Sequence, residues 1–292
     1  MLSDLHTHTI ASDGIKNVKD LMLIALDRGI THLAITDHDS ISSLEEFKNC
    51  VVYSEKYLGI SNDNRIIGIP GIEFGCPYGD YGEVHILGYG IDFKNQQLND
   101  TLNILKEGRK ERFHKMIDRL NKLGVEITED ELLKYSPLPG RSHFARILVD
   151  KNYVATSQEA FAKYIGNGKP GFVRRAFYSI PDTVDLIKAS GGIPVLAHPV
   201  ISGLSKDDIL KIVDYGVKGI EVFYPEHSIK HRKKLLQIAE EKSLIVTGGT
   251  DFHGIRHGLI QELGMPDYPE NYLNNFISHL TYKNLFVGEV KD

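Results

Sequence analysis

The chain has 292 residues, of which 41% are hydrophobic and 25% charged, and its formal net charge is −5. These values exclude a disordered chain, and two cysteines are too few for a disulfide framework or a Cys-rich zinc site. Because no run of about 20 apolar residues is present and the N-terminus lacks a secretory pattern, we expect a cytoplasmic protein that does not enter a membrane.

The first predicted element is a short strand that carries Asp4-Leu5-His6-Thr7-His8, with Asp13 five residues further on. Side chains two residues apart on a strand point to the same face, so His6 and His8 can bind one metal ion together. Taken alone, the pair is explained equally well as a surface strand that happens to carry two histidines.

Apolar strand-like runs then alternate with helical stretches. The expected strands are 33–35, 66–69, 84–87, 193–197, 219–223 and 244–246. The helices expected between them are 18–28, 42–57, 209–215 and 228–241, and Ser205 with Asp208 resembles a helix N-cap. This alternation predicts parallel strands joined by crossover helices, and therefore a barrel or an open α/β sheet.

The alternation stops between about residues 95 and 170. Helices are expected at 102–123, from 128, at 142–149 and at 157–164, with no convincing strand between them. We therefore predict a barrel made of residues 1–95 and 171–292, with residues 96–170 as a helical insertion that contributes to substrate binding. The stretch 101–177 holds 15 Lys and Arg against 9 Asp and Glu. This basic segment suits an anionic ligand, although a solvated basic helix face explains it equally well.

Functional side chains converge at the C-terminal ends of barrel strands, and polar residues stand at these points in the chain. The first strand and these strand ends together supply nine candidate metal ligands: His6, His8, Asp13, His38, Glu73, His85, His198, Asp251 and His253. Nine ligands exceed the four that one zinc ion uses, so a cluster of two or three metal ions is expected. Three carboxylates and no cysteine favour manganese, iron or zinc.

Five segments, DLHTHTIASDG, ITDHD, GIE, AHP and TDFH, closely resemble the PHP family, the polymerase and histidinol phosphatase superfamily. The resemblance implies a distorted (β/α)7 barrel with metals at its C-terminal mouth. It also implies three ligand sets: His6, His8, Glu73 and Asp251; Glu73, His85 and His198; and Asp13, His38 and His253. His85 is the least constrained of these positions, since its spacing varies within the family.

The helical stretch after the third strand resembles the insertion of the family's nucleotide-phosphatase branch, because Arg141-Ser142-His143-Phe144-Ala145-Arg146 matches that branch's Arg-x-His-Phe-Ala-Arg run. The resemblance implies a phosphoric monoester hydrolase that acts on AMP or a 3',5'-nucleotide bisphosphate. Arg141, His143 and Arg146 are then candidate substrate-binding residues. Alternatively, Arg146 forms a surface ion pair and His143 stabilises its own helix.

The expected mechanism is in-line attack on phosphorus by a hydroxide that bridges two metals, while another metal binds a phosphate oxygen. His198, Asp251 and His253 are the candidate catalytic residues, and His198, His253 or metal-bound water can protonate the leaving oxygen. The alternatives are a 5'-3' exonuclease on short RNA, a histidinol-phosphate phosphatase, a metal-dependent amidohydrolase and a non-catalytic metal-binding module. An amidohydrolase is less favoured, because this chain lacks a lysine at a strand end where such an enzyme would be expected to carry one. No obligate protein partner is indicated.

Overall fold

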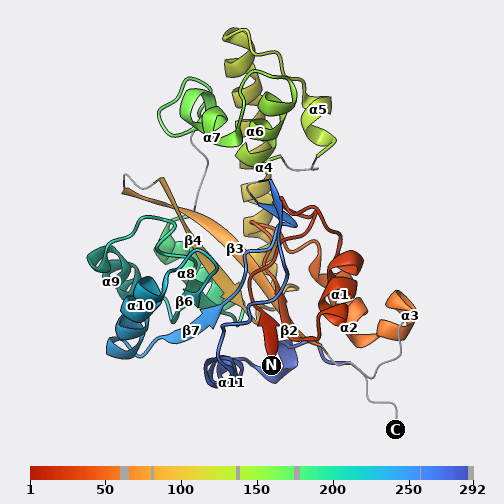
Figure 1. Cartoon of the computed structure of the whole chain (residues 1–292), viewed down its shortest axis with the longest axis vertical. Helices are drawn as coiled ribbons and strands as arrows, with labels where there is room; N and C mark the ends of the chain where they lie inside the picture. The colour runs from red at the N-terminus through yellow and green to blue at the C-terminus, as the bar shows by residue number, and fades with distance from the viewer. Residues whose placement is uncertain (60–65, 80–81, 136–138, 174–177, 257, 289–292) are drawn as a thin grey trace.

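The computed structural model describes residues 1–59, 66–79, 82–135, 139–173, 178–256 and 258–288. Within these residues, seven strands form one sheet whose spatial order follows the chain (Figure 1). The strands are β1 Leu2–Asp4, β2 Ile30–Ile35, β3 Ile67–Tyr78, β4 Gly82–Tyr89, β5 Ile193–Leu196, β6 Gly219–Phe223 and β7 Ile245–Gly248. A separate hairpin, β8 Ile255–Arg256 with β9 Leu259–Ile260, follows β7.

The strand directions correct one expectation. β1, β2 and β3 are mutually parallel, as are β5, β6 and β7, but β4 runs antiparallel to both of its neighbours. The prediction of parallel strands throughout is therefore wrong for β4. β3 and β4 form a long hairpin that needs no crossover helix, because an antiparallel partner can follow through a tight turn.

The two ends of the sheet meet. The amide of Leu5 donates to the carbonyl of Gly248 at 3.2 Å, and Phe252 N donates to the carbonyl of His6 at 3.1 Å. Gly249 permits this approach, because a Cβ at that position would lie 2.5 Å from the backbone nitrogen of His6. The sheet thus closes on itself after β1 and β7, which confirms the predicted distorted α/β barrel with a helical insertion.

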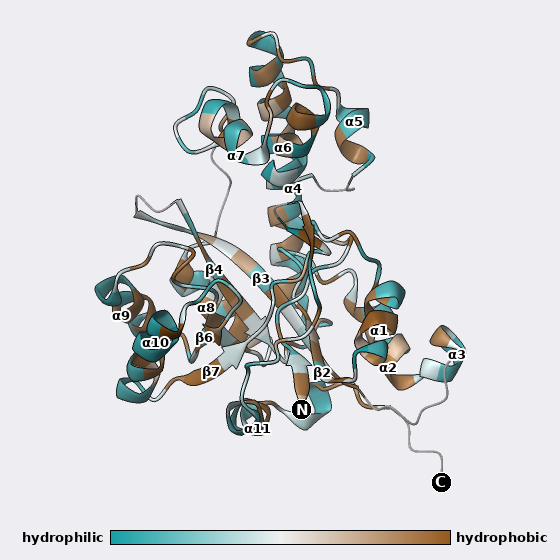
Figure 2. Ribbon diagram, viewed as in Figure 1, coloured by the Kyte–Doolittle hydropathy of each residue, from teal (hydrophilic) through white to brown (hydrophobic). Residues whose placement is uncertain are grey.

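The helices are α1 Val18–Asp27, α2 Leu44–Val52, α3 Ser54–Leu58, α4 Gln96–Lys122, α5 Glu129–Leu133, α6 Arg141–Asp150, α7 Ser157–Ala160, α8 Ile180–Ala189, α9 Lys206–Asp214, α10 Ile229–Glu241 and α11 Glu270–His279. The helices around the sheet pack apolar residues into the barrel core, whereas α5, α6 and α7 lie apart from the sheet in the insertion (Figure 2). α1 illustrates this packing: Val18, Leu21, Met22 and Ala25 recur at helical spacing and are buried. The predicted N-cap of α9 is confirmed, since Ser205 and Asp208 form a capping box.

Other helices depart from expectation. The expected helix 42–57 is divided into α2 and α3, while 157–164 is α7 followed by a π-helical turn over Phe161–Ile165. α8 and α11 were not predicted, although Ser179 caps α8 and a proline stands in its first turn. No helix among the described residues combines the length and apolar character that crossing a membrane requires.

The helical insertion follows β4, the strand expected at 84–87, and α4 links it to the barrel (Figure 1). Leu98, Leu102 and Leu105 in the first half of α4 pack into the barrel core. Further along the helix, Phe113 and Leu120 belong to a second apolar cluster within the insertion. Because α4 takes part in both cores, it holds the insertion over one end of the barrel. The domain bounds at residues 96 and 170 stay a prediction.

Candidate metal centre

The carboxylate of Glu73, on β3, lies at the middle of a histidine cluster. Glu73 is fully buried, and its oxygens face ring nitrogens from four other parts of the barrel. The distances are 3.3 Å to His6, 3.2 Å to His8, 3.0 Å to His38, 2.9 Å to His85 and 3.2 Å to His198. One carboxylate among five histidines is an arrangement suited to bridging cations.

Two further carboxylates complete the cluster. Asp251 lies 3.4 Å from His6 and 3.2 Å from His8. Asp13 lies 3.1 Å from His253 and 4.0 Å from His38. The structure therefore brings all nine sequence-predicted ligands together, although they come from loops and strands spread over nearly 250 residues of chain.

The residues fit metal ions. His6 Nε2, His8 Nε2 and Glu73 Oε2 are buried and make no hydrogen bond, which is costly for a polar atom unless another ligand satisfies it. Burial lowers the pKa of His8, but the nearby carboxylates of Asp251 and Glu73 outweigh it and raise that pKa to about 10. Conversely, burial raises the pKa of Glu73, whereas the surrounding histidines hold it well below its usual range. The cluster thus attracts positive charge.

The ligand atoms fall into three groups compact enough for one ion each. These are His6, His8, Glu73 and Asp251; His8, Asp13, His38 and His253; and His38, Glu73 and His85. The first equals one predicted set, and the second contains another with His8 added. The third has His38 where the resemblance implied His198, although His198 Nε2 is 3.2 Å from Glu73 Oε1. The assignment of ligands to individual ions stays a prediction.

A layer of buried carboxylates holds the ligands in place. Glu221, on β6, is fully buried; its side chain lies 3.1 Å from His6 Nδ1 and accepts the amide hydrogen of His198 at 2.9 Å. Asp37 accepts hydrogen bonds from Thr9 and Ser12, in the loop after the first histidines. Such outer contacts fix the tautomer and orientation of metal-binding histidines.

Backbone strain concentrates at the same place. His198, Asp251 and Asp39 have positive φ angles of 23°, 53° and 46°, a region that residues with a Cβ rarely adopt. Two of these residues are predicted ligands and the third follows His38 directly. Strain of this kind persists only where surrounding contacts hold it, and it clusters at functional sites.

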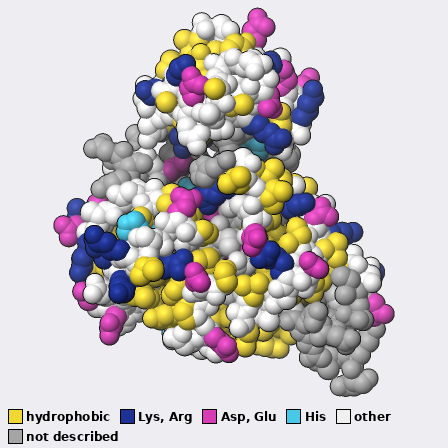
Figure 3. All heavy atoms as spheres, viewed as in Figure 1, with side chains coloured by type: hydrophobic (Ala, Val, Ile, Leu, Met, Phe, Trp, Pro, Cys, Tyr) yellow, Lys and Arg dark blue, Asp and Glu magenta, His cyan; other side chains and the backbone are white. Residues whose placement is uncertain are grey.

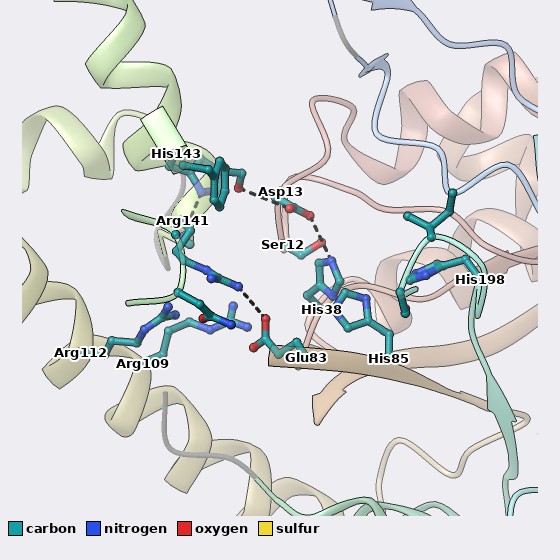
Figure 4. A pocket seen from close by; sticks show the side chains of 17 residues that line it. Ser12, Asp13, His38, Glu83, His85, Arg109, Arg112, Arg141, His143 and His198 are labelled. Carbon is teal, nitrogen blue, oxygen red and sulfur yellow. Dashed lines mark hydrogen bonds and ion pairs between the residues drawn. The ribbon is translucent and has the colours of Figure 1, made fainter. Parts of the chain in front are cut away.

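A cavity of about 560 Å³ opens beside the cluster, between the barrel and the insertion. The surface is hollowed at this junction in Figure 3. Asp13, His38, His85 and His198 line its barrel side. On the opposite side Figure 4 shows arginines from α4 and the start of α6. The cavity therefore lies between a wall of candidate metal ligands and a wall that carries Arg109, Arg112 and Arg141.

The three predicted substrate residues are placed differently. Arg141 lines the cavity, and its guanidinium donates to Glu83 at 2.9 Å. His143 also lines it, but its Nδ1 accepts the Gly140 amide at 3.0 Å, the helix-stabilising role that was its alternative. Arg146 is exposed, stacks 4.5 Å from the Tyr135 ring centroid and is not among the lining residues. Its contact with substrate stays a prediction.

Sequence reasoning missed several residues of the site. Arg109 and Arg112 lie on α4, where the pattern shows only a polar helix face, and Glu83 precedes His85 on β4. Glu221 had a usable signal, since a single acid inside an otherwise apolar strand demands a buried partner. Arg174 and Arg175, which belong to the basic stretch 101–177, lie outside the described residues.

A distorted α/β barrel with a His, Asp and Glu cluster at the ends of its strands defines a metal-dependent hydrolase. The model of the PHP domain family matches residues 4–167, more than half of the chain. The chain therefore belongs to the PHP family.

Two curated relatives are similar over most of their length. The 3',5'-nucleoside bisphosphate phosphatase of Chromobacterium violaceum is 32% identical over 87% of this chain and 88% of its own. The 5'-3' exoribonuclease Rnm of Salmonella typhimurium is 31% identical over 87% of this chain and 85% of its own. Both alignments extend well beyond residue 167, so the similarity includes the second half of the barrel.

Two solved structures share the fold. An amidohydrolase of Chromobacterium violaceum, solved with bound sulfate and no metal, has a TM-score of 0.80 and 30% identity, covering 95% of this chain and 96% of its own. A candidate metal-dependent phosphoesterase of Bifidobacterium adolescentis has a TM-score of 0.78 and 25% identity, covering 96% of each chain. The barrel and its insertion thus occur together in these neighbours.

Proposed function

We propose that the protein is a metal-dependent phosphatase that hydrolyses a phosphate monoester of a nucleotide, either AMP or a 3',5'-nucleotide bisphosphate. The observation that carries the proposal is the cavity that joins the nine-ligand cluster to a wall of arginines. A phosphate monoester needs positive charge on both sides, because its own charge repels a nucleophile. The phosphatase of Chromobacterium violaceum, at 32% identity, supports this class of substrate.

The nine clustered residues would hold two or three divalent ions, with Glu73 shared between groups. When bound, such ions neutralise phosphate charge and lower the pKa of water to about 7, which supplies a nucleophile at neutral pH. The chain's own contribution is to fix the ligands. Glu221 orients His6 and His198, while Asp37 holds the loop that carries Asp13. The catalytic roles of His198, Asp251 and His253 stay a prediction.

The insertion is suited to bind phosphate. α6 begins at Arg141, and its first residues, Gly140 to His143, line the cavity. The amides at a helix N-terminus carry partial positive charge, which favours a phosphate group nearby. Ser142 Oγ lies 3.4 Å from Asp13 Oδ2, so this helix end reaches the metal-binding loop itself. Arg141 adds a bidentate hydrogen-bond donor at the same place.

We expect Arg141→Ala to raise the Michaelis constant for a 3',5'-nucleotide bisphosphate by about tenfold while kcat changes much less, since a charge-assisted hydrogen bond contributes about 1.5 kcal/mol. Steady-state phosphate release gives both constants. Arg28→Ala is the matched control, because Arg28 also pairs with a carboxylate, Glu262, at 2.9 Å but does not line the cavity. A Michaelis constant equal to that of the control would remove Arg141 from the substrate site.

A 5'-3' exonuclease on short RNA is the second candidate. The similarity to Rnm at 31% identity favours it, and the basic cavity wall can hold a further phosphodiester as well as a nucleotide phosphate. The amidohydrolase alternative finds less support, although one structural neighbour carries that name. A carbamylated bridging lysine would have to reach the cluster, and no lysine is among the described residues that line the cavity.

Phosphate release by the manganese-loaded protein distinguishes these candidates. The substrates are AMP, adenosine 3',5'-bisphosphate, histidinol phosphate and a 5'-phosphorylated oligoribonucleotide whose products are separated by length. We expect turnover of one or both nucleotides. Shortening of the oligonucleotide without nucleotide turnover would replace the proposal by the exonuclease, and no hydrolysis of any substrate would overturn the phosphoesterase assignment for this chain.

A further inference from the structure

Three arginines converge on the insertion side of the cavity. Arg109 and Arg112 lie three residues apart on α4, so their side chains share one helix face, and Arg141 begins α6. Arg109 and Arg112 are 8% and 9% exposed, which is unusual for charged side chains. So much positive charge in a nearly closed wall requires an anion nearby.

The three arginines differ in the groups that they contact. Arg109 pairs with Asp39 of the barrel, whereas Arg112 Nε donates to the carbonyl of Val173 at 2.8 Å. Arg141 pairs with Glu83 at 2.9 Å. Burial, followed by the charge of Arg141, lowers the pKa of Arg112 to about 10, while the carboxylate of Glu83 acts in the opposite direction. Glu83 therefore pairs with Arg141, and its charge also acts on Arg112.

Glu83 is the only acid besides Asp13 among the described residues that line the cavity. It lies on β4, two residues before His85, and its side chain points to Arg141 in Figure 4. The figure places its carboxylate between the arginine wall and the histidines of the barrel. A carboxylate in that place occupies the position where an anionic group of a bound ligand would meet the arginines.

We propose that the Glu83 carboxylate competes with the substrate for Arg109, Arg112 and Arg141. It occupies the place of a second anionic group of the substrate and thereby sets the enzyme's selectivity between nucleotides with one and with two phosphates. The proposal rests on the function proposed above, in which the scissile phosphate lies at the metal cluster. A second phosphate must displace the Glu83 carboxylate from Arg141, and a single phosphate at the cluster need not.

The sign of the effect separates this role from a simple supporting one. If Glu83 competes with the ligand, removing its charge strengthens binding of a second phosphate. If Glu83 instead holds Arg141 in a productive orientation, removing its charge weakens that binding. Charge pairs of this kind change affinity by about tenfold in either direction.

The test compares wild type with Glu83→Gln in the metal-loaded full chain, using adenosine 3',5'-bisphosphate and AMP. We expect the constant for AMP divided by the constant for adenosine 3',5'-bisphosphate, each a Michaelis or dissociation constant, to rise about tenfold in Glu83→Gln. Michaelis constants are used where the nucleotide is hydrolysed. Calorimetric dissociation constants are used where it is not, so the test of Glu83 does not depend on turnover. Glu83→Ala is a second variant with the same expected sign.

Glu262→Gln is the control, since Glu262 also pairs with an arginine but lies outside the cavity. In an Arg141→Ala background, Glu83→Gln should change the ratio much less, because the group for which Glu83 competes is gone. An unchanged or lowered ratio in both Glu83 variants would overturn the role of Glu83. Absence of hydrolysis by wild type, with the ratio shifted as expected, would overturn the proposed function alone, and failure of both nucleotides to bind would overturn both.

Discussion

Glu73→Gln should lower kcat/KM for phosphate release at least about 10³-fold and should reduce the metal content of the purified protein. The reason is its central place: its carboxylate faces ring nitrogens of five histidines at 2.9 to 3.3 Å. Bound metal ions supply several kcal/mol of transition-state stabilisation, and each 1.4 kcal/mol is a factor of ten in rate. A glutamine keeps the shape but removes the charge that two of the three ligand groups share.

Metal content by elemental analysis and phosphate release on the same preparations measure both effects. Glu262→Gln, an exposed glutamate outside the cluster, is the matched control and should retain wild-type values. Thermal unfolding of both variants shows whether each is folded. A folded Glu73→Gln protein with full metal content would remove Glu73 from the centre, whatever its activity.

Glu221→Gln should weaken metal binding by about 10- to 100-fold, the usual cost of removing an outer contact of a metal-binding histidine. Glu221 faces His6 Nδ1 at 3.1 Å and accepts the amide hydrogen of His198 at 2.9 Å, while it lies in none of the three ligand groups. A glutamine has one acceptor oxygen in place of two and cannot serve both partners equally. The two predicted ligands would then lose their fixed orientation.

Activity titrated with manganese after chelation reports this effect. We expect the Glu221→Gln curve to shift to higher metal concentration and to reach a substantial fraction of wild-type activity at saturation. Glu73→Gln should show no such recovery, because it lacks a ligand and not merely the support of one. Superimposable titration curves for wild type and Glu221→Gln would contradict the supporting role.

The convergence of the nine candidate ligands could be predicted from sequence because most of them stand in short motifs at or near strand ends, and strand ends converge in a barrel. His6, Glu73 and Asp251 illustrate this: their separations along the chain are large, yet their strand positions place them at one mouth. The parallel strand groups follow from the same alternation of strands and helices, whereas that alternation left a barrel and an open sheet equally possible and only the resemblance to the PHP family implied closure. The local sequence pattern was sufficient to place a residue in the candidate site wherever that placement depended only on the strand that carries it.

Other features depend on contacts that no local pattern carries. The antiparallel direction of β4 follows from the hairpin with β3, and the apolar run of 84–87 reads the same in either direction. Arg109 and Arg112 look like any solvated helix face until α4 is placed against the barrel and α6. Glu83 can be recognised as part of the site only from its contact with Arg141, which the insertion supplies. Each of these required the tertiary arrangement.

Metal removal and restoration test the central claim most directly. The full chain is treated with a chelator, dialysed, and assayed for phosphate release from adenosine 3',5'-bisphosphate before and after manganese is added back. The account predicts negligible release by the stripped protein and recovery on addition of two or three manganese ions per chain. Equal release with and without metal would contradict it.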